Sequence, residues 1–258
     1  HHTPGTYVDV MEIVDAGNLA LLAGVGPMGL AAISYILNRE ERKPSLLVVT
    51  DIDQHRLNRA AHLYSSEFAK SKGIELHYIN TSKLQDPVTF IKNLNGGEGY
   101  NDVFVFAPVS EVIEQADRLL TFDGCLNFFA GPADSQFRAR LNFYNVHYAF
   151  THIVGTSGGN TDDIKESLEM MEKGLDPSGL ITHIGGLNAV PDATLNLPHI
   201  PGGKKLIYNH MEMPLTAIAD FGELGKKHPL FKDLAEICDR HDGLRSLEAE
   251  ELLLKYCG

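Results

Sequence analysis

The chain has 258 residues, of which 43% are hydrophobic and 22% are charged, and its formal net charge is −12 at pH 7. A chain of this length can bury one large hydrophobic core or two moderate ones. Its acidic balance and its lack of a Lys/Arg cluster argue against nucleic acid or an anionic membrane as a partner. The three cysteines, Cys125, Cys238 and Cys257, are widely spaced, which predicts a reducing, cytoplasmic setting and no disulfide framework.

The most informative stretch follows a short N-terminal segment, residues 1–17. An apolar run predicts a buried strand over Leu19–Ala23, and a second apolar run predicts a helix over Pro27–Leu37. The turn between them reads Gly24-x-Gly26-x-x-Gly29. In this pattern the first glycine makes the turn, the second lets the backbone approach a pyrophosphate, and the third allows close packing of helix on strand.

Two other interpretations of this stretch need to be weighed. Residues 19–37 carry no charge, but three glycines and a proline leave each half far shorter than the roughly 20 apolar residues of a membrane span. A chance glycine motif is the second alternative. The next predicted strand, Leu46–Thr50, ends at Asp51, which lies 22 residues beyond Gly29. A carboxylate at about that distance hydrogen-bonds a ribose diol in dinucleotide-binding proteins, so the combination favours a dinucleotide site.

Strands and helices continue to alternate as far as about residue 174, which predicts a doubly wound parallel α/β sheet of about six strands. Ligands of such sheets bind at the carboxyl ends of the strands. Beyond Gly174 the pattern changes to isolated strands and a Pro- and Gly-rich stretch, which predicts a smaller, separately packed portion. The further expected strands are Ile74–Ile79, Asp102–Pro108, Cys125–Gly131, His152–Gly155, Leu180–Ile184 and Lys205–Tyr208, and the expected helices include Asp53–Ser71, Asp86–Leu94, one starting at Thr161, and Ser246–Tyr256.

Several motifs are missing from the sequence. It has no Tyr-x-x-x-Lys pair of the short-chain dehydrogenases, no GxxxxGK[ST] phosphate loop, no HExxH and no cysteine cluster for zinc. A methyltransferase also uses a glycine-rich turn followed by an acidic residue. The run Pro27-Met28-Gly29, which leads directly into a helix, suits a dinucleotide better than S-adenosylmethionine.

The turn Ala23–Gly29, together with Val49–Asp53 and Arg56, resembles the medium-chain, zinc alcohol dehydrogenase family, and within it the sugar-phosphate reductases. The resemblance extends along most of the chain but covers no motif after about Glu223. The segments that carry the closer resemblance are His2–Gly5, Ser45–Asp53, Asp102–Pro108, Cys125–Pro132, Asn142–Tyr148, Val154–Asp163 and Ile200–Tyr208.

This family holds its catalytic zinc on an N-terminal domain with a Cys ligand and a Gly-His-Glu motif, and neither is present here. The resemblance therefore implies that roughly 100–150 residues, an ordinary domain, precede His1 in a longer parent. It divides this chain into a connecting segment (1–17), an NAD-binding Rossmann domain (18–159) and the C-terminal part of a split catalytic domain with extra helices (160–258). We expect zinc only in the parent, no catalytic residue and no activity in this chain alone, and exposed apolar surface where the missing domain packs.

The resemblance also assigns the cofactor site. The turn residues would hold the pyrophosphate, Asp51 would bind the adenosine ribose with Asp53 and Arg56 beside it, and three later strand ends would line the nicotinamide half of the groove. The complete set is Gly24, Gly26, Pro27, Met28, Gly29, Asp51, Asp53, Arg56, Ala107, Pro108, Val109, Phe129, Ala130, Gly131, Thr156 and Ser157. Packed strand ends with no ligand remain an alternative for the last three groups.

A carboxylate at Asp51 repels a 2′-phosphate and favours NAD(H) over NADP, although Arg56 could offset its charge. The expected function is an NAD-linked oxidoreductase acting on a small sugar-phosphate substrate, with zinc polarising the carbonyl in the parent. The alternatives are a related polyol or threonine dehydrogenase, or a dinucleotide-binding module without activity. Family members commonly pair through the edge of the sixth strand, here His152–Gly155, so a homodimer or higher homo-oligomer is expected.

Overall fold

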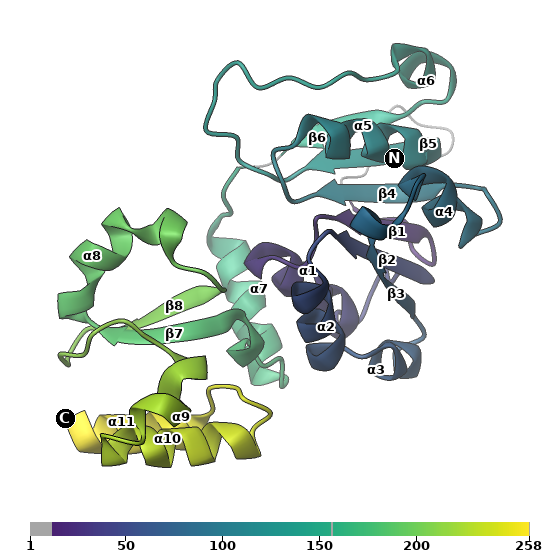
Figure 1. Cartoon of the computed structure of the whole chain (residues 1–258). Coiled ribbons are helices and arrows are strands. Elements are labelled where there is room, and N and C mark those ends of the chain that lie inside the picture. Colours follow the sequence, from purple (N-terminus) through teal and green to yellow (C-terminus); the bar gives the residue numbers. More distant parts are fainter. Residues whose placement is uncertain (1–11, 156, 258) are drawn as a thin grey trace. The chain divides into compact units, whose positions relative to one another are not determined.

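A computed structural model describes residues 12–155 and 157–257 of the chain, so most of segment 1–17 and the predicted contact residue Thr156 lie outside the described residues. The chain forms two compact units, His1–Leu175 and Asp176–Gly258. Each unit has its own sheet and its own core (Figure 1). No described helix is long and apolar enough to cross a membrane.

The first unit contains a six-stranded, fully parallel sheet in the order β3-β2-β1-β4-β5-β6. This is the doubly wound order of a Rossmann fold, and it confirms the predicted fold class. From β1 the order runs one way through β2 to β3, and from β4 it runs the other way through β5 to β6. The crossovers that follow β1 and β4 therefore leave these neighbouring strands on opposite faces of the sheet. The strands are β1 (Asn18–Leu22), β2 (Leu46–Asp51), β3 (Glu75–Asn80), β4 (Tyr100–Val105), β5 (Leu120–Phe128) and β6 (His152–Gly155).

Helices cover both faces of this sheet, but unevenly (Figure 1). Helices α4 and α5 bury one face, where their apolar side chains pack with those of β1, β2, β4 and β5 in one cluster. Helices α1, α2 and α3 belong to the β1–β2 and β2–β3 crossovers, on the other side. The helices of this unit are α1 (Pro27–Asn38), α2 (Gln54–Leu63), α3 (Ser66–Ser71), α4 (Pro87–Asn93), α5 (Ser110–Leu119), α6 (Phe143–Tyr148) and α7 (Thr161–Glu172).

The helix expected over Asp53–Ser71 is two helices, because the chain leaves the helical conformation at Tyr64 and Ser65. The Ser65 hydroxyl accepts a hydrogen bond from the Phe68 N–H at 3.1 Å and so caps the start of α3. Serine is a strong N-cap residue, and this cap supplies one of the acceptors that a new helix start needs.

The β1–α1 turn depends on the absence of a side chain at Gly29. A Cβ atom there would lie 2.1 Å from the carbonyl oxygen of Gly24 and 2.4 Å from its carbonyl carbon. The Gly24 N–H donates to the carbonyl of Thr50 at 2.9 Å, which also ties the turn to β2. Helix α1 therefore starts against the end of β1 with no room for a methyl group.

The second unit packs a three-stranded sheet, in the order β8-β7-β9, against C-terminal helices. Strands β7 and β8 are parallel, whereas β7 and β9 are antiparallel. Large apolar side chains stay exposed in its β7–β8 connection: Leu187, Leu195 and Leu197. The elements are β7 (Ile181–Gly186), α8 (Val190–Leu195), β8 (Lys204–Tyr208), β9 (Thr216–Ala217), α9 (Phe221–Leu224), α10 (Pro229–Arg240) and α11 (Leu247–Cys257).

The boundary between the compact units falls after Leu175, later than the boundary at residue 159 that the resemblance implies. Helix α7 accounts for the difference. The Tyr35 hydroxyl on α1 donates to Glu166 on α7 at 2.7 Å, and Lys173 lies 3.9 Å from Glu40 just beyond α1. These contacts group α7 with the first unit.

We expect Gly29→Ala to destabilise the first unit strongly, because the new methyl group would overlap backbone atoms that cannot move aside. Overpacking of this kind costs about 1–3 kcal/mol, and a clash with backbone puts this variant at the upper end, about 3 kcal/mol. Urea unfolding followed by circular dichroism measures the loss. Full retention of wild-type stability would mean that the helix does not pack this closely on the strand.

Candidate functional site

The predicted site residues lie in the loops that leave the carboxyl ends of β1, β2, β4, β5 and β6. These strands are parallel neighbours, so their carboxyl ends meet at one edge of the sheet. Residues 24–29 follow β1, Asp51 ends β2 and residues 52–56 follow it, residues 107–109 follow β4, residues 129–131 follow β5, and Ser157 follows β6. The topology therefore brings to one edge all the predicted positions that the structure describes.

Gly26 is the N-cap of α1, and Pro27 occupies the first position of the helix. No side chain caps this end, so the free backbone N–H groups of the first turn point beyond the helix and attract an anion. A Cβ atom built on Gly26 would meet no atom of the described residues within 4 Å. The fold itself therefore has no steric need for glycine here, whereas a ligand close to the backbone would have one.

Asp51 is the last residue of β2 and is 9% exposed. Its Oδ1 atom accepts hydrogen bonds from the N–H groups of Ile52 at 2.8 Å and Asp53 at 3.0 Å, which fixes the carboxylate at the strand end. Among the described residues no hydrogen bond reaches its Oδ2 atom. One oriented acceptor is thus available to a hydroxyl pair beside the β1–α1 turn.

Asp53 and Arg56, predicted beside the ribose, interact with each other and with helix α2. The Asp53 Oδ1 atom accepts from the N–H groups of His55 and Arg56, and so caps α2. Its Oδ2 atom lies 3.5 Å from the Arg56 Nε atom. The guanidinium therefore has a carboxylate partner already, which reduces its capacity to neutralise a 2′-phosphate.

Ile52 is a candidate site residue that the sequence pattern did not single out. It lies between Asp51 and Asp53, and its side chain is 71% exposed, although it is aliphatic. Val109, the N-cap residue of α5 after β4, is also apolar and exposed. The sequence did contain a signal for Ile52. The buried strand ends at Asp51, so burial in the strand does not explain an aliphatic residue at the next position, between two aspartates.

The end of β5 is tied to the end of β4 through its backbone. The N–H groups of Phe129 and Ala130 both donate to the carbonyl of Val105, at 3.1 and 3.0 Å. The Phe129 ring also packs on Phe106, with the ring centroids 5.4 Å apart. Gly131 has open space around its Cα atom. These contacts hold the β5 loop at the same edge as the β1–α1 turn.

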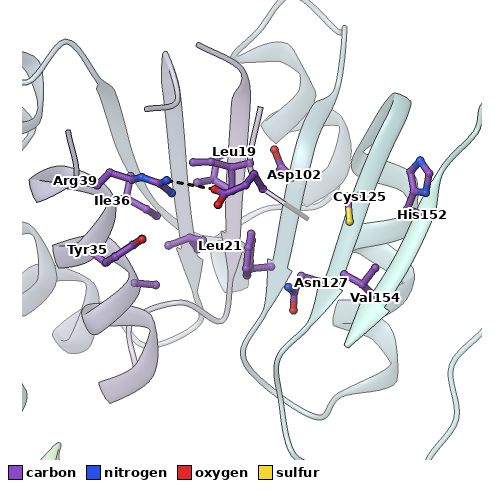
Figure 2. A pocket seen from close by; sticks show the side chains of 14 residues that line it. Leu19, Leu21, Tyr35, Ile36, Arg39, Asp102, Cys125, Asn127, His152 and Val154 are labelled. Atoms are coloured by element: carbon purple, nitrogen blue, oxygen red, sulfur yellow. Dashed lines mark hydrogen bonds and ion pairs between the residues drawn. The ribbon is translucent and has the colours of Figure 1, made fainter. Parts of the chain in front are cut away.

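A separate cavity of about 350 Å³ lies on one face of the sheet, over β1, β4, β5 and β6 (Figure 2). We call it the sheet-face cavity. Among its lining groups, Cys125 has a thiol pKa raised to about 12, by burial first and then by the charges of Asp102 and Asp123. Residues 12–155 and 157–257 contain no group of three or more His, Cys, Asp or Glu side chains that could hold a metal ion.

The edge thus combines an uncapped helix N-terminus, a glycine with free space in front of it and an oriented carboxylate on the neighbouring strand. This combination, on a doubly wound sheet, is the arrangement typical of dinucleotide-binding α/β proteins. The chain belongs to the zinc-binding dehydrogenase family, whose model matches residues 27–173. The resemblance to zinc-type alcohol dehydrogenases is therefore confirmed.

Curated relatives resemble the whole chain. It is 54% identical over 259 residues to the uncharacterized protein YggP of Escherichia coli, 52% identical over 257 residues to a mannitol-1-phosphate 5-dehydrogenase of Aliivibrio fischeri, and 44% identical over 257 residues to an L-sorbose 1-phosphate reductase of Klebsiella pneumoniae. These alignments cover 100%, 99% and 99% of this chain. They cover only 61%, 60% and 59% of the relatives, so the chain spans about three fifths of their length.

Solved structures of zinc-type alcohol dehydrogenases share the fold. The benzyl alcohol dehydrogenase of Acinetobacter calcoaceticus matches with a TM-score of 0.59 and 21% sequence identity. The match covers 76% of this chain and 51% of that enzyme. This likeness supports the architecture of the chain and says nothing of its substrate.

We expect the Cys125 thiol to be a poor nucleophile near neutral pH, because the thiolate is the reactive form and a pKa of about 12 leaves almost none of it. At pH 8, iodoacetamide should alkylate Cys125 at least about 100-fold more slowly in the folded chain than in urea, and the rate should rise with pH. Peptide mass spectrometry resolves Cys125 from the other cysteines. Equal rates in the folded and unfolded chain would contradict the assignment.

Proposed function

We propose that this chain is the cofactor-binding part of an NAD(H)-dependent, zinc-type oxidoreductase that acts on a phosphorylated sugar or sugar alcohol. The cofactor assignment rests on the position and surroundings of Gly26. It caps α1 without a side chain, and none of the residues that the structure describes fills the space in front of its Cα atom. A pyrophosphate placed there meets the N–H groups and the positive end of the helix dipole of α1.

The neighbouring strand supports NAD(H) over NADP(H). Asp51 offers its Oδ2 atom to the hydroxyls of the adenosine ribose, whereas a 2′-phosphate in the same place would meet a fixed negative charge. Arg56 cannot compensate fully, since its guanidinium already lies beside Asp53. We further propose that the exposed side chains of Ile52 and Val109 contact the adenine ring from the ends of β2 and β4.

The chemistry we propose is reversible hydride transfer between the nicotinamide and a carbinol carbon of the substrate. When bound in the parent, zinc supplies a Lewis acid that polarises the substrate oxygen. The residues of this chain bind and orient the cofactor: the β1–α1 turn holds the pyrophosphate, Asp51 fixes the ribose, and the loop Phe129–Gly131 and Ser157 flank the nicotinamide half.

The substrate class rests on the names of two relatives, a mannitol-1-phosphate dehydrogenase and an L-sorbose 1-phosphate reductase. Both names describe a phosphorylated six-carbon compound with an alcohol or carbonyl group that can be interconverted. We propose that the residues which choose among such substrates, and those that bind zinc, belong largely to the part of the parent outside this chain.

We also propose a cytoplasmic enzyme that forms a homodimer or higher homo-oligomer. Cys125 and Cys238 are free thiols, as a reducing compartment requires. Strand β6 is the last strand on its side of the described sheet, so one row of its backbone groups is available for pairing with a second copy.

Gly26→Ala separates cofactor binding from folding. A methyl group at this position meets no protein atom, so we expect urea stability within about 0.5 kcal/mol of wild type, the usual range for a neutral substitution. The new methyl group would intrude on the pyrophosphate, so the dissociation constant for NADH should rise at least tenfold, which corresponds to about 1.4 kcal/mol. Titration followed by NADH fluorescence measures it. Unchanged affinity would place the cofactor elsewhere.

Asp51→Asn tests the choice of cofactor. The amide retains a hydrogen-bonding oxygen but removes the charge that opposes a 2′-phosphate, so NADPH affinity should rise relative to NADH affinity by about tenfold, or 1.4 kcal/mol. Parallel titrations with NADH and NADPH give the ratio, and Asp86→Asn, an exposed helix cap distant in sequence, is the matched control. An unchanged ratio would remove Asp51 from this role.

A further inference from the structure

The connection between β5 and α6, residues 129–142, contains no helix or strand, and the structure describes all of its residues. It leaves the sheet at the carboxyl edge and returns past α5 to α6 (Figure 1). Backbone N–H and C=O groups outside a helix or sheet need other partners. The partners of this connection show what holds it in place.

Polar side chains from successive turns of α5 bind backbone groups of the connection. These side chains belong to Ser110, Glu114 and Asp117, and we call them the α5 latch. Their spacing of four and then three residues places them on one face of the helix. The Ser110 hydroxyl donates to the carbonyl of Arg138 at 2.7 Å. The Glu114 Oε1 atom accepts from the Arg140 N–H at 3.2 Å.

Asp117 makes the third contact from a buried position. The residue is 5% exposed, and its Oδ2 atom accepts from the Asn142 N–H at 3.1 Å. Its Oδ1 atom is also buried and has no hydrogen-bond partner among the described residues. A buried carboxyl group with an unpartnered oxygen lowers the stability of a fold. Packing stability therefore does not account for an acidic residue at this position.

The returning part of the connection also packs on the core of the first unit. Phe137, Ala139 and Leu141 are partly buried against the apolar cluster that α4 and α5 form with the sheet. The Phe137 ring stacks on Phe128, the last residue of β5, with the ring centroids 6.0 Å apart. Residues 129–136 therefore form a loop whose two ends meet at the end of β5, and the α5 latch fixes the segment that follows this loop.

The first part of the same loop, Phe129–Gly131, is the part that we assign to the nicotinamide half of the cofactor. Two hydrogen bonds to the Val105 carbonyl tie its backbone to β4. The α5 latch begins beside it, because Ser110 directly follows Val109, the N-cap residue of α5 at the carboxyl edge. The loop is thus held at one end by β4 and at the other end by α5.

We propose that Ser110, Glu114 and Asp117 are positioning residues that hold the loop 129–136 in its nicotinamide-binding geometry. A loop that is already ordered loses less conformational entropy when the cofactor binds. A loosened loop adopts the binding geometry for a smaller fraction of the time, and the apparent dissociation constant rises by the inverse of that fraction. This inference rests on the proposed function, which places Phe129–Gly131 beside the nicotinamide.

The test compares NADH with ADP, which has the adenosine and pyrophosphate groups but no nicotinamide. Glu114→Ala removes the acceptor for the Arg140 N–H from a partly exposed position. By calorimetric titration of the 258-residue chain, we expect its dissociation constant for NADH to rise about fivefold and that for ADP to change by less than about twofold.

Two further variants at α5 serve as controls for this substitution. Glu114→Gln retains a side-chain oxygen that can accept from the Arg140 N–H, so it should bind NADH within about twofold of the wild type. Glu111→Ala removes the same type of side chain from an exposed position three residues earlier, outside the α5 latch. It should bind both ligands as the wild type does.

Asp117→Ala gives a second test, in which stability and affinity change in different directions. It removes a buried oxygen without a partner, so the melting temperature should rise or stay within about 2 °C of the wild type. It also removes one contact of the α5 latch, so the dissociation constant for NADH should rise about fivefold. A residue with only a structural role would lower the melting temperature and weaken both ligands together.

Equal losses of NADH and ADP affinity in Glu114→Ala, or no loss of either, would overturn the proposal. A wild-type chain that does not bind NADH would refute the proposed function, and amide hydrogen exchange then tests the α5 latch separately. The Ala130 N–H, which donates to Val105, should exchange about fivefold faster in Glu114→Ala than in the wild type or Glu111→Ala. Equal exchange rates in the three proteins would show that the α5 latch does not hold the loop.

Discussion

The close contact between Gly29 and Gly24 is the constraint on which the first unit depends. It lets α1 begin directly against the end of β1, and so places the uncapped N-terminus of the helix at the carboxyl edge of the sheet. The hydrogen bond from the Gly24 N–H to Thr50 then fixes the turn beside Asp51. A fold constraint at one glycine thus positions the uncapped helix end, the free space at Gly26 and the Asp51 carboxylate together.

Much of this arrangement was predictable because its causes are local. The glycine spacing, the apolar runs of β1 and β2 and the terminal Asp51 all act within about 35 residues, and the expected strands agree closely with β1, β2 and β6. Strand β5 was harder to predict. It starts at Leu120 and not at Cys125, since the strand continues through Asp123 although that residue has a φ of 56°. A turn-like Asp-Gly sequence inside a strand is stabilised by tertiary contacts, here the Asp123 N–H to Ala149 and its carboxylate to His152.

The candidate site residues, like the strands, fall into those that the local sequence predicts and those that depend on the folded structure. Gly26 and Asp51 follow from motif spacing, whereas the capping role of Asp53 and the pairing of Arg56 depend on where α2 begins. Asp53 was expected beside the ribose, and in the structure its carboxylate caps α2. Ile52, between the two aspartates, is an exposed aliphatic side chain. Residue type alone could not separate these roles, since two aspartates two positions apart look equivalent in the sequence.

We propose that a dinucleotide binds at the N-terminus of α1 and the end of β2. Nuclear magnetic resonance of the ¹⁵N-labelled chain during titration with NAD⁺ tests this most directly, because it reports each backbone amide separately. We predict saturable shifts concentrated at the amides of Val25, Gly26, Met28 and Ile52. No saturable shift at these amides at millimolar NAD⁺, or the largest shifts at Cys125 and Asn127 in the sheet-face cavity, would contradict the account.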